Sequence, residues 1–90
     1  MTRPYDADRI GARIKQIRIV FGLSQAEVGK ICECGPTTVS NWEKGRQKPT
    51  IPQAMKLGDR LGLDLEFVYL GRLRQVPFDI ARKLSADAET

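Results

Sequence analysis

The chain has 90 residues, 41% of them hydrophobic, which is enough for one small domain and too little for two separate cores. Its 15 Lys and Arg residues outnumber 11 Asp and Glu residues, and the formal net charge of +4 favours an anionic partner. It has no histidine, no signal peptide and no apolar run near the roughly 20 residues that span a bilayer, so we expect a cytoplasmic protein with no membrane partner.

The first predicted helix begins near Asp6 or Asp8, either of which can cap its first turn. An apolar stripe with spacings of four, three and four follows, formed by Ile10, Ile14, Ile17 and Phe21. Gly22 ends the helix in the position where a left-handed residue is usual. This segment is therefore predicted to be an amphipathic helix that packs on a core.

Two short helices are predicted between Ser24 and Gly45. Ser24 and Glu27 form an S-x-x-E capping box that opens the first of them. Gly35-Pro36 opens the second, because proline is pre-organised for a first helical position and has no amide to leave unpaired there. Two short helices joined at a sharp angle form a device for reading the DNA major groove.

A second capping box, formed by Thr50 and Gln53, predicts a helix through Leu61. Asp64 can cap a short fifth helix, whose inward side chains are predicted to be Leu65, Val68 and Tyr69. No segment shows sustained strand alternation. The predicted fold is therefore all-α, with five helices.

The helical signal weakens after Gly71, so we predict one domain over residues 1–71 and a short C-terminal extension over residues 72–90. Apolar side chains that could line a short helix there are Phe78, Ile80, Ala81 and Leu84. Because this pattern is short, we favour a partly ordered tail that folds back on the domain over a dimerisation arm.

Cys32 and Cys34 are the only cysteines, and one intervening residue is poor spacing for a disulfide. With no histidine to complete a zinc site, we expect neither a metal nor a cofactor. We interpret the two thiols as small buried hydrophobes; the alternative is a redox sensor, which needs an exposed thiol with a lowered pKa. The chain also lacks a nucleophile–base arrangement and a glycine-rich phosphate loop, so no catalytic site is expected.

Four separated stretches of the chain resemble the Cro and phage-repressor type of helix-turn-helix domain. They are IGARIKQIR, GLSQAEVGKI, TTVSNWEKGRQKP and LGDRLGLDLEFVYL, and they follow one another in the order and spacing of that family. The resemblance covers residues 10–70. It implies a compact, lambda-repressor-like five-helix domain that binds double-stranded DNA.

The expected reading surface lies on the helix of residues 36–44. This helix is too short to be stable alone, so Val39 and Trp42, three residues apart, are predicted to anchor it on the core. Asparagine can bond adenine through both amide groups, and threonine offers a hydroxyl and a methyl that suits thymine. We therefore interpret three polar residues as base-reading: Thr37, Thr38 and Asn41.

The resemblance also implies contacts that position the domain. Gln25, which opens the first helix of the motif, takes the place of a phosphate-binding residue, and the helix N-terminus adds free amides and positive dipole character. Basic residues after the reading helix are expected to meet the DNA backbone: Lys44, Arg46 and Lys48. Arg18 and Glu43 match a pair that forms a structural salt bridge in phage repressors.

The chain departs from the family pattern at three positions. Glu33 stands in the turn where glycine is usual, which predicts a strained left-handed residue. Gly35 replaces the usual serine or threonine cap of the reading helix. Pro36 stands where a polar contact is common and cannot donate a hydrogen bond, so its contribution is limited to shape or an apolar contact in positioning the DNA.

Two functions follow from this sequence. The leading one is a transcriptional regulator, a repressor that binds a palindromic operator as a homodimer with helix 36–44 in the major groove. Pairing is expected through residues 51–70 or through the tail. The alternative is an antitoxin or adaptor-like interaction module that retains the fold and binds a protein partner through residues 72–90.

Overall fold

The computed structural model describes residues 3–72, and within that range it contains five helices and no strand. The helices are α1 (Ala7–Val20), α2 (Gln25–Cys32), α3 (Pro36–Glu43), α4 (Ile51–Leu61) and α5 (Leu65–Leu70). The all-α, five-helix prediction is confirmed. The helix and the chain reversal predicted for the tail lie outside the described residues.

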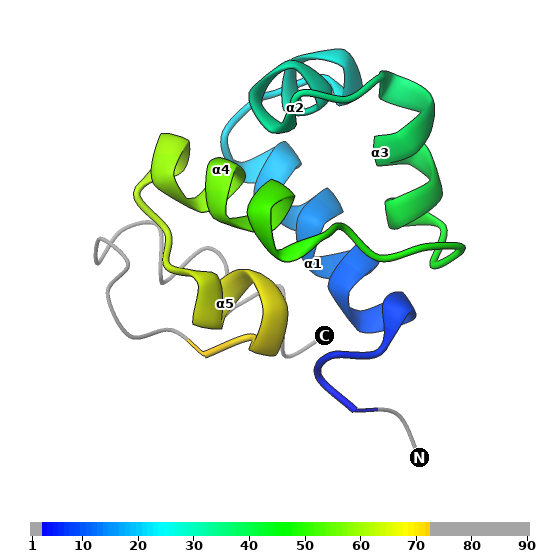
Figure 1. Ribbon diagram of the computed structural model, residues 1–90, viewed down its shortest axis with the longest axis vertical. Helices are drawn as coiled ribbons and strands as arrows, with labels where there is room; N and C mark the ends of the chain where they lie inside the picture. The colour runs from blue at the N-terminus through cyan, green and yellow to red at the C-terminus, as the bar shows by residue number, and fades with distance from the viewer. Residues whose placement is uncertain (1–2, 73–90) are drawn as a thin grey trace.

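The helices form one bundle around α1 (Figure 1). α3 and α5 pack against α1, α2 packs against both α3 and α4, and α4 also packs against α5. α3 stands at the edge of the molecule, with the loop that leads to α4 at its lower end in Figure 1. The helix expected to read DNA is therefore supported from behind and open on its outer side.

Reciprocal capping boxes begin α2 and α4. The Ser24 hydroxyl accepts a hydrogen bond from the Glu27 amide at 3.0 Å, and the Glu27 carboxylate accepts one from the Ser24 amide at 2.8 Å. In the second box, the Thr50 hydroxyl accepts a hydrogen bond from the Gln53 amide at 3.2 Å, and Gln53 Oε1 accepts one from the Thr50 amide at 2.8 Å. Each box satisfies two amides that a helix start otherwise leaves unpaired. Both capping predictions are confirmed.

The caps of α5 and α1 differ from each other. Asp64 Oδ1 accepts a hydrogen bond from the Phe67 amide at 3.0 Å, as predicted for α5. Asp6 stands at the N-cap of α1, but neither it nor Asp8 caps that helix through its side chain. The Asp6 carboxylate instead accepts a hydrogen bond from the Arg3 amide at 2.7 Å, because residues 3–6 form a turn. The side-chain cap predicted for α1 is therefore wrong.

The core consists of two hydrophobic clusters, with Leu61 and Tyr69 packed against both. The first cluster contains Ile10, Ile14, Val28, Cys32, Val39, Trp42 and Leu57. The second contains Ile17, Ala54, Leu63, Phe67 and Val68. The isoleucine stripe of α1 contributes to both clusters, so the amphipathic prediction for this helix is confirmed. Truncating one of the large buried side chains, such as Ile14 or Leu57, to alanine is expected to cost about 2–5 kcal/mol.

The inward face of α5 contains the three predicted side chains and one more. Val68 is buried, and Leu65 and Tyr69 are half-buried and pack against the core. Phe67 is also buried, and the prediction missed it. A helix of six residues is shorter than two turns, so its sequence does not define a face.

α1 and α3 meet through their backbones at Gly11. A Cβ at this position would collide with the carbonyl oxygen of Trp42. The Trp42 side chain is 1% exposed and lies in the first cluster, together with Val39. This contact and the two buried side chains hold α3 in one orientation, which confirms the predicted anchoring role of Val39 and Trp42.

The turn between α2 and α3 passes through Glu33, which adopts the left-handed conformation with φ 61° and ψ 46°. The predicted strain at this position is confirmed, and such a conformation costs a non-glycine residue about 1 kcal/mol. The Glu33 carboxylate lies 2.9 Å from Lys56 Nζ in an exposed ion pair. The turn thereby contacts α4 as well as the two helices that it joins.

Candidate nucleic-acid interface

α3 turns its polar residues away from the core. Thr37 is exposed and Thr38 and Asn41 are half-exposed, whereas Val39 and Trp42 on the opposite side are buried. Among the described residues, the side chains of Thr37, Thr38 and Asn41 have no hydrogen-bond partner. Their amide and hydroxyl groups are therefore available to an external partner without breaking an internal bond.

The N-terminus of α3 has no side-chain cap. Gly35 is the N-cap residue, and the exposed Pro36 occupies the first turn. Because proline has no amide, the first-turn amides without a side-chain acceptor are those of Thr37 and Thr38. This end of the helix is thus open to an acceptor, such as a phosphate oxygen, that approaches from outside.

The helix ends at Glu43, one residue earlier than the predicted range, because Lys44 is the C-cap.

Glu43, at the end of α3, accepts hydrogen bonds from two side chains. Arg18 on α1 donates through Nε at 2.8 Å to Glu43 Oε2 and through Nη2 at 3.1 Å to Glu43 Oε1. This is the ion pair expected from the resemblance, with side chains 19% and 6% exposed. The hydrogen bond to Glu43 raises the pKa of Arg18 despite the opposing effect of burial.

Gln25 joins this ion pair, which the sequence analysis did not predict. Its Nε2 donates to Glu43 Oε1 at 3.2 Å, while Arg18 Nη1 donates to the carbonyl oxygen of Leu23 at 3.2 Å. A glutamine amide has two N–H donors, so one can bond Glu43 and the other can bond a phosphate. The network ties the start of α2 to the end of α3, the two places where the domain is expected to meet DNA.

The loop after α3 exposes three basic side chains: Lys44, Arg46 and Lys48. Gly45 makes the reversal possible with φ 73°, and Arg46 N donates to the carbonyl oxygen of Asn41 at 2.9 Å. At the far end of the loop, the Tyr69 hydroxyl donates to the buried Pro49 carbonyl oxygen at 2.6 Å. Both ends of this basic loop are therefore held in place.

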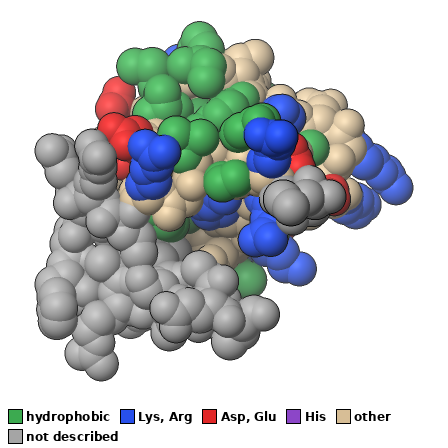
Figure 2. Space-filling view, turned by 90° about the horizontal axis from the view of Figure 1, so that it is seen from below, with side chains coloured by type: hydrophobic (Ala, Val, Ile, Leu, Met, Phe, Trp, Pro, Cys, Tyr) green, Lys and Arg blue, Asp and Glu red, His purple; other side chains and the backbone are tan. Residues whose placement is uncertain are grey.

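Several basic side chains stand on the same side of the molecule as α3. On the face seen from below, Lys and Arg side chains stand near the centre and at the right edge, and the right is the side of α3 and its following loop in Figure 1 (Figure 2). This distribution gives that side a positive field suited to a polyanion.

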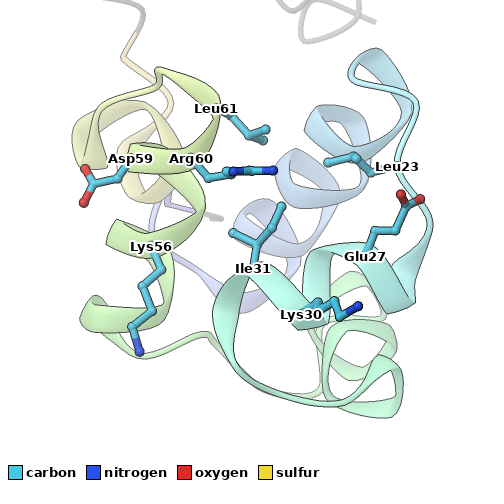
Figure 3. Close-up of a pocket in the computed structure, with 8 residues that line it drawn as sticks. All are labelled: Leu23, Glu27, Lys30, Ile31, Lys56, Asp59, Arg60 and Leu61. Carbon is cyan, nitrogen blue, oxygen red and sulfur yellow. The ribbon is translucent and has the colours of Figure 1, made fainter.

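A groove between α2 and α4 lies apart from this surface (Figure 3). It has a volume of about 880 Å³. Its lining residues are Leu23, Glu27, Lys30, Ile31, Lys56, Asp59, Arg60 and Leu61. None of them belongs to α3 or to the loop that follows, so the groove is not part of the candidate interface.

The thiols do not have the properties of a redox sensor. Cys32 is buried, and burial raises its pKa to about 11. Cys34 is half-buried, and burial raises its pKa also. A raised pKa reduces the thiolate fraction, which is the opposite of what thiol reactivity requires. The described residues favour the interpretation of both thiols as packing groups.

Residues 3–72 contain no group of three or more side chains that could together bind a metal ion. None of the helices in that range is long and apolar enough to span a bilayer.

A comparison with protein families matches residues 14–68 to the helix-turn-helix model, which is more than half of the chain. The chain belongs to the Cro/C1-type helix-turn-helix family. It is a non-enzymatic DNA-binding domain of the kind found in transcriptional regulators. The resemblance described from the sequence, and the fold that it implied, are confirmed.

A relative in Bacillus subtilis (strain 168) is described as an uncharacterized HTH-type transcriptional regulator, YqaF. It is 33% identical over 51 residues, which is 57% of this helix-turn-helix chain and 67% of the relative. No solved structure gives a significant match.

Proposed function

We propose that this protein is a sequence-specific transcriptional repressor, which binds a palindromic operator as a homodimer with α3 in the major groove. The observation that supports this most is the two-sided character of α3. Its apolar side chains are buried, while Thr37, Thr38 and Asn41 face outward without internal partners. A helix presenting side chains of these types suits the width and hydrogen-bonding pattern of the major groove.

Contacts with the phosphate backbone hold α3 in register. Gln25 binds a phosphate at the N-terminus of α2, and Pro36 shapes the entry of α3 without donating a hydrogen bond. The basic loop contributes three further contacts: Lys44, Arg46 and Lys48. Such contacts set position and orientation without reading sequence. They weaken as the salt concentration rises, because the counterions that the protein releases from DNA then gain less entropy.

Pairing of two copies through residues 51–70 is supported by exposed apolar side chains on α4. Ile51 is 45% exposed and Met55 is 47% exposed, and their spacing of four places them on one side of the helix. A second copy that covers this pair would remove the two side chains from water. The resulting two-fold symmetry extends a short reading site into a palindrome.

Selection from a library of random duplex DNA tests this function. The expected result is an enriched motif with two inverted half-sites whose centres are about 10 base pairs apart, or a multiple of that spacing. A library without enrichment contradicts sequence-specific binding. Enrichment of a motif without symmetry contradicts the homodimer.

The resemblance to phage repressors supports repression over activation. A reporter gene with the selected motif placed inside its promoter distinguishes the two. Expression is expected to fall when the protein is produced, because a bound dimer blocks access to the promoter. A rise in expression contradicts the repressor assignment and leaves the DNA-binding assignment intact.

A further inference from the structure

The turn of residues 3–6 lies beside the basic loop that follows α3. Lys48 Nζ stands over the ring of Tyr5, 5.8 Å from the ring centroid. At the other end of the loop, a Cβ on Gly45 would collide with the Asp8 carboxylate, so the first turn of α1 touches the loop there too. Two separate contacts therefore join the beginning of the chain to this loop.

The turn is also fixed to the helices behind it. Arg13 Nη2 donates to the Pro4 carbonyl oxygen at 3.0 Å, and Arg13 Nη1 donates to the Val68 carbonyl oxygen at 2.9 Å. The Asp6 amide donates to the Arg3 carbonyl oxygen at 2.9 Å and closes the turn. Because Arg13 links the turn to α5, Tyr5 is held at a defined place rather than at a free chain end.

Tyr5 has unused binding capacity at that place. The residue is 41% exposed to solvent, and its hydroxyl has no hydrogen-bond partner among the described residues. A phenolic hydroxyl is a good donor to a phosphate oxygen, and an aromatic face attracts an ammonium group. Both groups of the Tyr5–Lys48 pair can therefore face the same anion.

We propose that Tyr5 and Lys48 form a single clamp on the DNA sugar-phosphate backbone, beside the loop that follows α3. The ring of Tyr5 orients the ammonium group of Lys48, and the Tyr5 hydroxyl donates to a phosphate on the same strand. This proposal rests on DNA binding by α3 and adds Tyr5 to its surface.

The clamp is tested with the full chain and a 20-base-pair duplex of random sequence, over a series of salt concentrations. The variants are Tyr5→Leu, Tyr5→Phe, Lys48→Ala and the double variant Tyr5→Leu/Lys48→Ala. Arg60→Ala is the charge-matched control, because Arg60 lines the groove between α2 and α4 and lies away from the loop (Figure 3). Melting curves verify that each variant is folded at the temperature of the binding measurement.

Tyr5→Leu is expected to weaken binding by about three- to tenfold, and Tyr5→Phe by about twofold, because the latter keeps the ring and loses only the hydroxyl. Lys48→Ala is expected to weaken binding similarly and to lower the slope of log affinity against log salt by about 1. In the Lys48→Ala background, Tyr5→Leu is expected to cost less than half of its effect in the wild type. Arg60→Ala should cost less than twofold.

Two results would overturn the clamp. One is wild-type affinity in a folded Tyr5→Leu variant, which would make the Tyr5 contact a packing detail. The other is full additivity of Tyr5→Leu and Lys48→Ala, which would show that the ring does not orient the ammonium group. Failure of the proposed function has a different signature, because wild-type protein would then bind random duplex and select no motif.

Discussion

At the scale of single residues, Glu43 connects α1 and the start of α2 to the end of α3. Its carboxylate accepts hydrogen bonds from Arg18 and Gln25 at distances between 2.8 and 3.2 Å. The residue therefore has a structural role, through the bond to α1, and a positioning role, through the amide expected to bind phosphate. Only the structural role was expected from the sequence.

The Arg18–Glu43 pair predicts an unequal response to two charge deletions. Glu43→Ala should lower the free energy of unfolding by about 2–3 kcal/mol, because it leaves a half-buried guanidinium without its partner. Lys56→Ala breaks the exposed pair with Glu33 and should cost less than about 1 kcal/mol. Urea denaturation of the two variants measures both values. Equal losses would mean that burial of the Arg18–Glu43 pair does not matter.

The Cys32 thiol predicts a loss of stability in alkaline solution. Its pKa is raised from 9.0 to about 11 by burial, so the unfolded chain ionises first as the pH rises. Its stabilising contribution is complete below pH 9 and is lost between about pH 9 and pH 11, with a size of about 2–3 kcal/mol. Urea denaturation across this pH range gives the free energy of unfolding of the wild type and of Cys32→Ala. The effect is the difference between the two slopes of this free energy against pH. Parallel pH profiles would contradict it.

At the scale of helices, the function depends on how α3 sits on α1. The backbones touch at Gly11, and Val39 and Trp42 fill the space beside that contact. α3 is only eight residues long, so its orientation comes from this packing and not from its own stability. A change at the contact should therefore alter DNA binding as well as stability.

Gly11→Ala tests that dependence. The new methyl group would collide with the Trp42 carbonyl oxygen and force α3 outward, so we expect a loss of about 1–3 kcal/mol in unfolding free energy. Gly35→Ala is the matched control, since a Cβ there has nothing within 4 Å and the loss should stay below about 1 kcal/mol. Thermal melts measure stability. Binding to the selected operator, at a temperature where both variants are folded, reports whether α3 keeps its orientation. A fully stable, fully binding Gly11→Ala variant would refute this packing argument.

The elements that were predictable are those set by neighbouring residues. The capping boxes at Ser24 and Thr50 follow from a few positions along the chain, whereas the left-handed Glu33 was expected from the family resemblance. The contacts that were missed join residues far apart, such as Gln25 with Glu43 and Tyr5 with Lys48. Pair geometry of this kind depends on the packing angle of whole helices, which single-sequence periodicity does not contain. The base-reading assignments stay predictions, because they depend on a partner.

At the scale of the whole molecule, the exposed apolar side chains bear on assembly. Ile51 and Met55 lie on α4, within the region proposed for pairing, and Ile19 on α1 is 60% exposed. A dimer formed through α4 would cover the first two and leave the third in solvent. The same substitution, an apolar residue to glutamate, is therefore expected to have different effects on dimerisation when it is made on α4 and when it is made at Ile19.

Met55→Glu should convert the dimer to a monomer, because it places a charge at the centre of the proposed pairing surface. Ile19→Glu introduces the same charge at another exposed apolar position, outside α4, and should leave the protein dimeric. Sedimentation equilibrium at several protein concentrations measures the association state of each variant. A dimeric Met55→Glu protein would move the interface away from α4.

The central claim is that α3 reads base sequence, and the most direct test compares the motifs selected from random duplex DNA by the wild type and by Asn41→Ala. We expect the variant to lose preference at one base pair of each half-site, by about 1–3 kcal/mol of discrimination, and to keep it at the others. If both proteins select the same motif with equal preference at every position, Asn41 does not read a base, which contradicts the role proposed for α3.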